Sequence, residues 1–229
     1  MKKPVCAVLG IGPKNGQAFA RAFHEQGYRL ALLSRSTDLS GNLAAELGDT
    51  VAIACDAADP NSVREAFAKI QVELGPVDVL IYNAGSGSWR NVEEVTVEDF
   101  ERGFRINALG ALVASQAVIP DMIANGRGNI VFVGATASLR GVPMTAGFAP
   151  AKAAQRILAQ SMAKHLAPKG IHVSVIIVDG QIGDPESAEV LDGTRLDPRD
   201  IAQTAIGLTE QSQSAWSFEV DLRPKKEKW

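Results

Sequence analysis

Seven short apolar runs recur along this chain, separated by segments of helix length, and this alternation limits the possible folds more than any other feature. Runs such as VDVLIY and HVSVIIV are almost continuously apolar, which is typical of strands covered by helices on both faces of a sheet. The predicted strands span residues 5–9, 29–34, 50–54, 77–82, 129–133, 172–178 and 217–221. We therefore predict a doubly wound parallel α/β sheet, which is a three-layer Rossmann fold.

The segments between these runs have start and stop signals typical of helices. Asp59 and Asp197 each precede a proline, as an N-cap residue before a proline at the first helical position does, and Gly27, Gly48 and Gly170 stand where C-terminal glycines are expected. The predicted helices span residues 16–26, 39–47, 60–74, 96–124, 147–167 and 198–210. A chain of 229 residues suits a single domain, which we place at 1–229.

Bulk properties disfavour several classes of protein. A formal net charge of -3 offers no basic surface for nucleic acid or acidic lipid. No apolar segment approaches the ~20 residues of a membrane span, and the basic start followed by an apolar run has no small-residue cleavage site, so we expect a cytoplasmic protein outside the membrane. Cys6 and Cys55, in predicted strands one and three, should lie ~10 Å apart and stay reduced. The three histidines lack metal-ligand spacing, so we expect no metal site.

A glycine-rich loop lies between the first predicted strand and the first predicted helix. Its cofactor-binding candidates are Gly10, Gly12, Lys14, Asn15 and Gly16. Glycines allow backbone N–H groups to approach a pyrophosphate, which then lies at the positive end of the helix. The spacing is not G-x-G-x-x-G, so a simple strand-to-helix turn is the alternative. The position at the first strand of an alternating chain favours dinucleotide binding.

Ser34 and Arg35 follow the second predicted strand, where NAD-selective sites place an acidic residue. The planar guanidinium of Arg35 matches a 2′-phosphate, and the serine hydroxyl adds a hydrogen bond. Lys14 could join them from the glycine loop. We therefore expect NADP(H) to be preferred over NAD(H). The alternative is that Arg35 simply leaves the sheet into solvent.

These motifs, and others that follow them in order, resemble those of the short-chain dehydrogenase/reductase family over roughly residues 5–178. The loop is similar to T-G-x-x-x-G-x-G, with Leu9 at the threonine and Lys14 at the middle glycine. Asp56 resembles the aspartate that contacts adenine. Asn107 resembles the asparagine of the catalytic tetrad. The further cofactor-binding positions that the resemblance implies are Ala57, Asn83, Ala84, Gly85 and Ile182.

The resemblance also implies that two catalytic groups are missing. Lys152 stands at the family's lysine, which holds the nicotinamide ribose, but Phe148 stands at the tyrosine that transfers the proton and Ala135 at the serine that steadies the carbonyl oxygen. A phenylalanine cannot transfer a proton. Replacement hydroxyls are Ser138, which we rank first, and Thr136, Thr145 and Tyr82, although loop capping or turn formation is the better explanation of each one taken singly.

Two functions remain open from the sequence. The first is an NADP(H)-dependent oxidoreductase that acts on a C=O, C=N or conjugated C=C bond of a small molecule with an unusual proton donor. The second is a catalytically silent NADP(H)-binding sensor or partner subunit. The resemblance implies a homodimer or homotetramer. The turn-rich segment 179–197 is a candidate substrate-covering loop, Trp89 and Arg90 could border the substrate, and the basic tail 225–228 is expected to be a solvated end.

Overall fold

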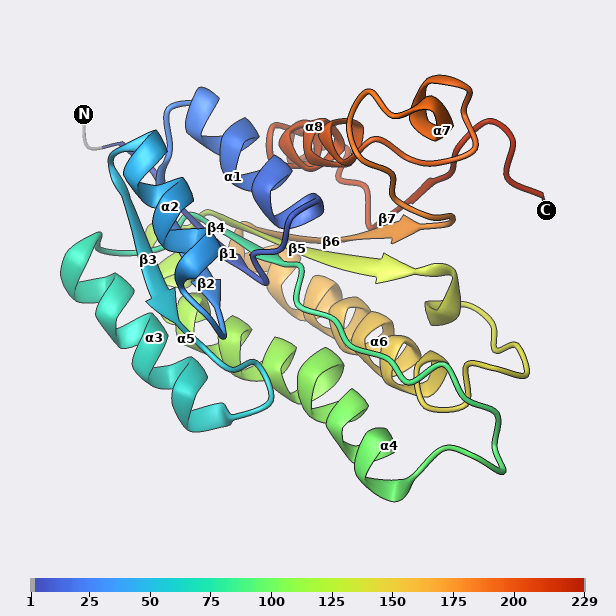
Figure 1. The fold of residues 1–229 in the computed structure, drawn as a ribbon. Coiled ribbons are helices and arrows are strands. Elements are labelled where there is room, and N and C mark those ends of the chain that lie inside the picture. Colours follow the sequence, from blue (N-terminus) through green and yellow to red (C-terminus); the bar gives the residue numbers. More distant parts are fainter. Residues whose placement is uncertain (1–2, 229) are drawn as a thin grey trace.

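The computed structural model describes residues 3–228. Seven parallel strands form one sheet in the order β3-β2-β1-β4-β5-β6-β7, with helices on both faces (Figure 1). The strands are β1 (Val5–Leu9), β2 (Arg29–Ser34), β3 (Thr50–Ala54), β4 (Val79–Tyr82), β5 (Gly128–Ala135), β6 (Ile171–Val178) and β7 (Glu219–Leu222). The helices are α1 (Asn15–Glu25), α2 (Asp38–Leu47), α3 (Pro60–Glu73), α4 (Val97–Phe104), α5 (Gly110–Asn125), α6 (Ala149–Leu166), α7 (Ala188–Leu191) and α8 (Pro198–Thr209). The predicted doubly wound α/β fold is confirmed.

Two hydrophobic clusters, one on each face of the sheet, explain the continuous apolar runs. In β1, the side chains of Ala7 and Leu9 enter the cluster under α3, α5 and α6, whereas those of Cys6 and Val8 enter the cluster under α1, α2 and α8. Successive residues of a strand point to opposite faces, so a strand covered on both faces must be apolar at every position.

Helix ends and strand bounds follow the sequence closely. Strands β1, β2 and β3 have the predicted bounds, and the other four differ by up to two residues at an end. The carboxylates of Asp59 and Asp197 accept the predicted N-cap hydrogen bonds, and Gly27, Gly48 and Gly170 have positive φ. Cys55 lies one residue beyond β3, and both cysteines are free thiols.

One predicted helix differs from the structure. The segment 96–124 is interrupted by a π-helical turn, Arg105–Leu109, between α4 and α5. Asn107 lies in this turn, and its side-chain amide donates to the carbonyl oxygen of Gly103 at 2.9 Å. Single π-helical turns inside helices often mark functional sites, and this one sets the position of Asn107.

The same helical stretch, Val97–Asn125, is long and apolar enough to cross a bilayer by length and composition, with a mean hydropathy of 1.4 in its most apolar window. The prediction from the sequence did not recognise this stretch as a candidate membrane span. Half of that window is buried inside the fold, as in the core helix of a protein that does not span a membrane. The absence of a membrane span therefore remains a prediction.

Candidate functional site

The glycine loop is held against the carboxyl end of β4. The amide of Asn83 donates to the carbonyl oxygen of Gly10 at 2.7 Å. Gly10 has φ +108, and a Cβ atom there would lie 2.4 Å from the backbone nitrogen of Ala84. A Cβ atom on Gly16 would lie 2.7 Å from the carbonyl oxygen of Gly10. Side chains are excluded at both positions, so the loop packs closely before α1, and Gly10 and Gly12 line a cavity near the start of this helix, where an anion binds well.

A first cavity of about 330 Å³ opens beside this loop. The predicted cofactor-binding residues that line it are Gly10, Gly12, Ser34, Arg35, Asp56, Ala57, Asn83, Ala84 and Gly85. Arg35 is exposed at the rim and forms no ion pair with any residue from 3 to 228. One carboxylate oxygen of Asp56 accepts from the backbone N–H of Ala58 at 2.9 Å. The cavity therefore offers a guanidinium without an ion pair and a carboxylate held by a backbone N–H.

Lys14 lies elsewhere than expected. Its ammonium donates to the carbonyl oxygen of Ile182 at 2.8 Å and lies 3.6 Å from the carboxylate of Asp184. It does not line the cavity that contains Arg35, so the expectation that the two would act together is wrong. The β1–α1 loop and the segment after β6 meet at the carboxyl edge of the sheet. The oxygen atoms that contact the ammonium of Lys14 therefore belong to that segment.

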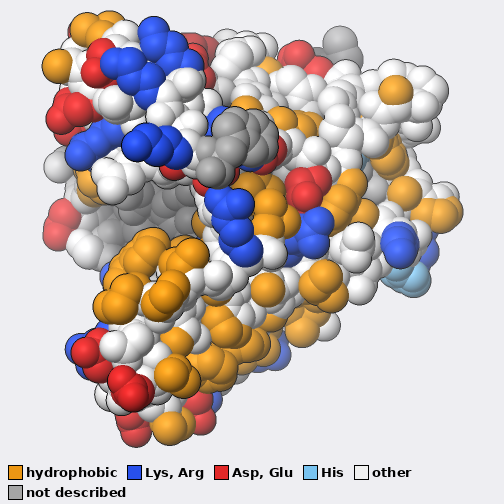
Figure 2. All heavy atoms as spheres, turned by 90° about the vertical axis from the view of Figure 1, so that its right-hand side faces the viewer, with side chains coloured by type: hydrophobic (Ala, Val, Ile, Leu, Met, Phe, Trp, Pro, Cys, Tyr) orange, Lys and Arg blue, Asp and Glu red, His pale blue; other side chains and the backbone are white. Residues whose placement is uncertain are grey.

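A second cavity, of about 860 Å³, lies beside the first, and Asn83 lines both. Figure 2 looks onto the edge where β5 and β6 end and shows this face hollowed. The predicted site residues that line the second cavity are Asn15, Ala135, Thr136, Phe148, Lys152 and Ile182, together with Trp89. The structure thus places the two candidate sites in neighbouring cavities, one lined by Arg35 and the other by Lys152.

Lys152 is buried in α6, with 5% of its surface exposed, so it is not the solvated lysine that a helix surface would present. Its ammonium donates to the carbonyl oxygen of Val133 at 2.8 Å and to the side-chain oxygen of Gln155 at 3.1 Å. Burial lowers the pKa of Lys152 to about 8 because it disfavours the charged form. An ammonium has three donors, so one N–H remains for a ligand.

Asn107 converges with Lys152 on Gly85. A Cβ atom on Gly85 would lie 3.4 Å from the ammonium nitrogen of Lys152 and 3.5 Å from the side-chain oxygen of Asn107. Asn107 is fully buried; its amide nitrogen donates to two backbone carbonyl oxygens, but its oxygen has no partner within residues 3–228. A buried acceptor without a partner is costly, so this oxygen is suited to a ligand or an ordered water.

The candidate hydroxyls separate into three places. Ser138, ranked first from the sequence, does not line this cavity; its oxygen accepts from the backbone N–H of Ala135, and it borders a separate cavity with Thr145. Tyr82 lies in the core, where its hydroxyl donates to the carbonyl oxygen of Ile106 and burial raises its pKa. Thr136 alone among the four candidates lines the cavity.

Thr136 is part of a polar network that the sequence did not reveal. Its hydroxyl donates to the carboxylate of Asp179, which also lies 3.1 Å from the guanidinium of Arg223. The three residues follow β5, β6 and β7, and the ends of adjacent parallel strands meet at one edge. That shared edge is the signal that could have identified Asp179 and Arg223.

Aromatic side chains form the mouth of the second cavity. The rings of Trp89 and Phe148 lie 5.6 Å apart, and Trp89 is 66% exposed. Arg90 does not line the cavity; its guanidinium is near Asp99. Of the predicted pair, only Trp89 borders the candidate substrate site.

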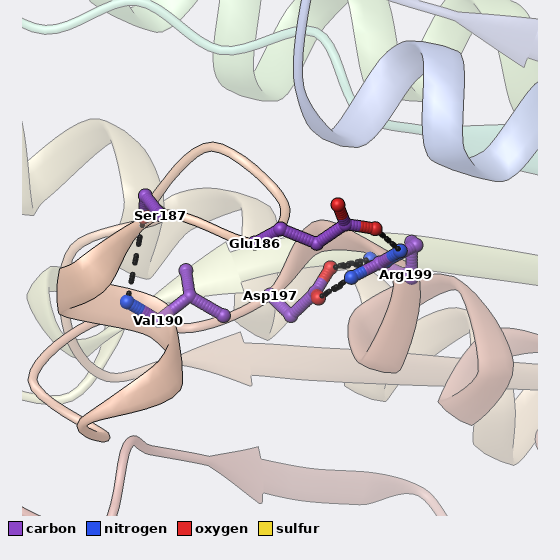
Figure 3. Close-up of polar contacts among 5 residues, drawn as sticks. All are labelled: Glu186, Ser187, Val190, Asp197 and Arg199. Carbon is purple, nitrogen blue, oxygen red and sulfur yellow. Dashed lines mark hydrogen bonds and ion pairs between the residues drawn. The ribbon is translucent and has the colours of Figure 1, made fainter.

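The segment 179–197 covers this cavity and is more ordered than its sequence suggests. It contains α7, and Arg199 at the start of α8 binds Asp197 and Glu186 (Figure 3). The hydroxyl of Ser187 accepts from the N–H of Val190 and caps α7. Seven of its residues line the cavity: Asp179, Gly180, Gln181, Ile182, Glu189, Thr194 and Arg195. No group of three or more histidine, cysteine or acidic side chains within residues 3–228 is placed to hold a metal ion.

Comparisons with known proteins agree on one family. The family model described as short chain dehydrogenase matches residues 5–181. A 3-oxoacyl-[acyl-carrier-protein] reductase of Bos taurus is 31% identical over 215 residues, which cover 90% of this chain and 91% of the reductase.

Solved structures are similar over almost the whole length. A short-chain dehydrogenase from Rhodopseudomonas palustris has 32% identity and a TM-score of 0.85, covering 96% of this chain and 98% of its own. An alcohol dehydrogenase from Thermococcus sibiricus, in complex with 5-hydroxy-NADP, has 25% identity and a TM-score of 0.89, covering 99% and 98%.

Proposed function

Since the chain belongs to the short-chain dehydrogenase family, we propose that it is an oxidoreductase that uses NADP(H) in preference to NAD(H). The proposed substrate is a small organic molecule with a C=O, C=N or conjugated C=C bond. The observation that carries the proposal is the pair of neighbouring cavities that share Asn83, one lined by Arg35 and the other by the buried Lys152.

The residues present fit such a cofactor. Arg35 and Ser34 would bind the 2′-phosphate, the backbone of Gly10 to Gly16 would face the pyrophosphate, and Asp56 would contact the adenine. Lys152 would hold the nicotinamide ribose, and Asn107 has the unsatisfied buried oxygen expected beside a ligand. NADPH supplies a hydride when it is bound. The protein must therefore supply binding, orientation and a proton.

We propose that the proton comes from Lys152. Phe148 and Ala135, at the positions that resemble the family's tyrosine and serine, line the cavity without a hydroxyl. Thr136 already donates its hydrogen to Asp179 and can only accept from a substrate. Lys152 has a free N–H and a pKa of about 8, close to the value that suits a general acid near neutral pH. Because the free N–H would hold the ribose, the N–H that donates to Gln155 would turn in carbonyl reduction and pass its proton to the developing alkoxide, directly or through one water, and bulk water would reprotonate the amine.

The same two residues favour a second candidate, a catalytically silent NADP(H)-binding sensor or partner subunit. General acid catalysis contributes ~10²–10⁴-fold, so loss of the acid alone can leave a chain that binds cofactor and turns over nothing.

Both candidates require binding of NADP(H), which calorimetry with NADPH and NADH tests. We expect NADPH to bind with micromolar or tighter affinity. No binding of NADPH would contradict both candidates. Consumption of NADPH with ketones, imines and enones then separates them. If the wild type turns over none of these and A135S/F148Y gains carbonyl reduction, the silent candidate is correct.

The family relationship also supports a homodimer or homotetramer of single-domain chains that acts in the cytoplasm without nucleic acid or membrane. Helices α4 and α6 expose apolar side chains, including Phe100 at 38% and Ile157 at 52%. Burying them between copies would stabilise an oligomer. Sedimentation of a single 24.3 kDa species at micromolar concentration would contradict this part of the proposal.

A further inference from the structure

The chain after β7 exposes Lys225, Lys226 and Lys228, as its sequence predicts for a solvated end, but it is also docked on the molecule. It passes beside the segment 179–197, on the same side of the molecule as α7 (Figure 1). The backbone N–H of Lys226 donates to the carbonyl oxygen of Gly193 at 3.0 Å, and its ammonium lies 3.1 Å from the carboxylate of Asp192. Pro224 is buried. Residues 223–228, here called the C-terminal tail, are therefore docked on the loop that covers the cavity.

The first residue of the tail fixes its base to the sheet. The guanidinium of Arg223 pairs with Asp179 at the end of β6 and with Asp221 in β7. Only 18% of the Arg223 side chain and 10% of the Asp179 side chain are exposed, so their ion pair is partly shielded from water. The tail therefore leaves the sheet in a defined direction.

This direction brings Glu227 to the substrate cavity. Glu227 lines the cavity together with Lys152, Phe148 and Trp89. A Cβ atom on Gly180 would lie 3.2 Å from a carboxylate oxygen of Glu227 and 2.8 Å from Pro224, so the tail lies directly on the backbone of Gly180. The N–H of Glu227 donates to the carbonyl oxygen of Pro224 at 2.9 Å, which holds the turn. Glu227 is thus part of the cavity wall.

The charges around the cavity indicate what Glu227 would bind. Asp179 is paired with Arg223 and Lys152 is bound to protein acceptors. The other ionisable residues that line it are Glu189, Glu227 and Arg195, and none of these forms an ion pair with a residue from 3 to 228. The lining thus holds two carboxylates without an ion pair, Glu189 and Glu227, as well as the guanidinium of Arg195 and the ammonium of Lys152, and Glu227 is half-buried. A half-buried carboxylate without a partner is stabilised by a cationic donor.

We propose that Glu227, delivered by the docked C-terminal tail, is a specificity-determining residue that binds a protonated amino group of the substrate. The apolar part of that substrate would lie toward Trp89 and Phe148. This inference rests on the proposed function, because it assumes that the bound molecule is a substrate. Binding of that molecule can still be measured without hydride transfer.

Benzylammonium and benzyl alcohol, which share a ring and differ in charge, are titrated calorimetrically into the full-length protein with and without NADPH. The wild type should bind benzylammonium about tenfold more tightly, as one charge-assisted hydrogen bond provides. Glu227→Gln should remove the difference, whereas Glu186→Gln, a control in the segment 179–197 that does not line the cavity, should keep it. Equal affinities in the wild type, no binding of either compound, or a difference that survives in Glu227→Gln would overturn the proposal.

Hydrogen exchange tests the docking separately. The amides of Lys226 and Glu227 should exchange at least about tenfold more slowly than in an unfolded peptide, and Gly180→Ala should remove this protection by displacing the tail. Unprotected amides in the wild type would overturn the proposal. Failure of NADPH to bind, with the tail protected and benzylammonium preferred, would instead contradict both candidates of the proposed function and leave this inference standing.

Discussion

The ammonium nitrogen of Lys152 lies 2.8 Å from the carbonyl oxygen of Val133, so a helix and the end of strand β5 share one buried charge. This contact holds the group that we propose as the acid. Its pKa of about 8 lies below the ordinary value of 10.5 because burial disfavours the charged form.

The first prediction is the pH dependence of reduction. The acid form is the ammonium, which is present below its pKa, so kcat/KM for NADPH-dependent reduction should be constant up to about pH 7 and should fall about tenfold per pH unit above pH 8. Initial rates between pH 6 and 10 measure this. Lys152→Met lacks the ammonium, so it should have no activity at any pH in this range. A profile that stays level to pH 10 in the wild type would exclude Lys152 as the proton donor.

The second prediction concerns stability. Because the folded-state pKa of Lys152 lies below its unfolded value, the unfolded chain binds more protons between about pH 8 and 10.5, and the free energy of unfolding should rise with pH in that window. Other groups titrate there too, so the comparison is with Lys152→Met. Urea titrations give the free energy of unfolding of the wild type and of Lys152→Met. Between pH 7.5 and 10, the wild type should gain at least about 1 kcal/mol of stability relative to Lys152→Met. A difference independent of pH would show that the ammonium is not buried.

The third prediction concerns the choice of cofactor. Arg35 is exposed at the rim of the first cavity without an ion pair, so its substitution should not disturb folding. Arg35→Ala should weaken NADPH binding by about 10- to 100-fold, as loss of a hydrogen bond to a charged group does, and should change NADH binding by less than about threefold. Calorimetry measures both. Equal losses of affinity for NADPH and NADH would show that Arg35 does not bind the 2′-phosphate.

The sequence predicted the fold well because the signals for it are local. Strands such as β1 are buried on both faces and bounded by turn residues, so their apolar runs coincide with their hydrogen-bonded bounds. The π-helical turn at Asn107 has no comparable signal, because its side-chain contacts run to the preceding helical turn and to Ser86.

The site was predicted less completely, since it depends on contacts between distant segments. Lys14 binds residues 182 and 184, a separation that no local pattern encodes. Thr136 and Ser138 are two residues apart, yet the tight turn that contains both directs them to different cavities. Glu227 was missed because a basic tail has the composition of a solvated end, whereas its docking depends on partners such as Asp192 and Gly193.

The fourth prediction separates the structural role of the glycine loop from its role in binding. At Gly10, φ is +108 and an added Cβ would lie 2.4 Å from backbone of the β4 end, so Gly10→Ala must strain the loop and should lower the free energy of unfolding by about 1–3 kcal/mol. Gly12 has no atom within 4 Å of an added Cβ and no positive φ, so Gly12→Ala should leave stability within about 0.5 kcal/mol of the wild type. The same methyl group would stand in the open cavity where we place the cofactor. Gly12→Ala should therefore weaken NADPH binding at least about tenfold while the fold is unchanged, since an ordered pyrophosphate needs close approach to the loop backbone. Urea unfolding and calorimetry on the two variants test this, and a Gly12→Ala protein that binds NADPH as tightly as the wild type would place the phosphates elsewhere.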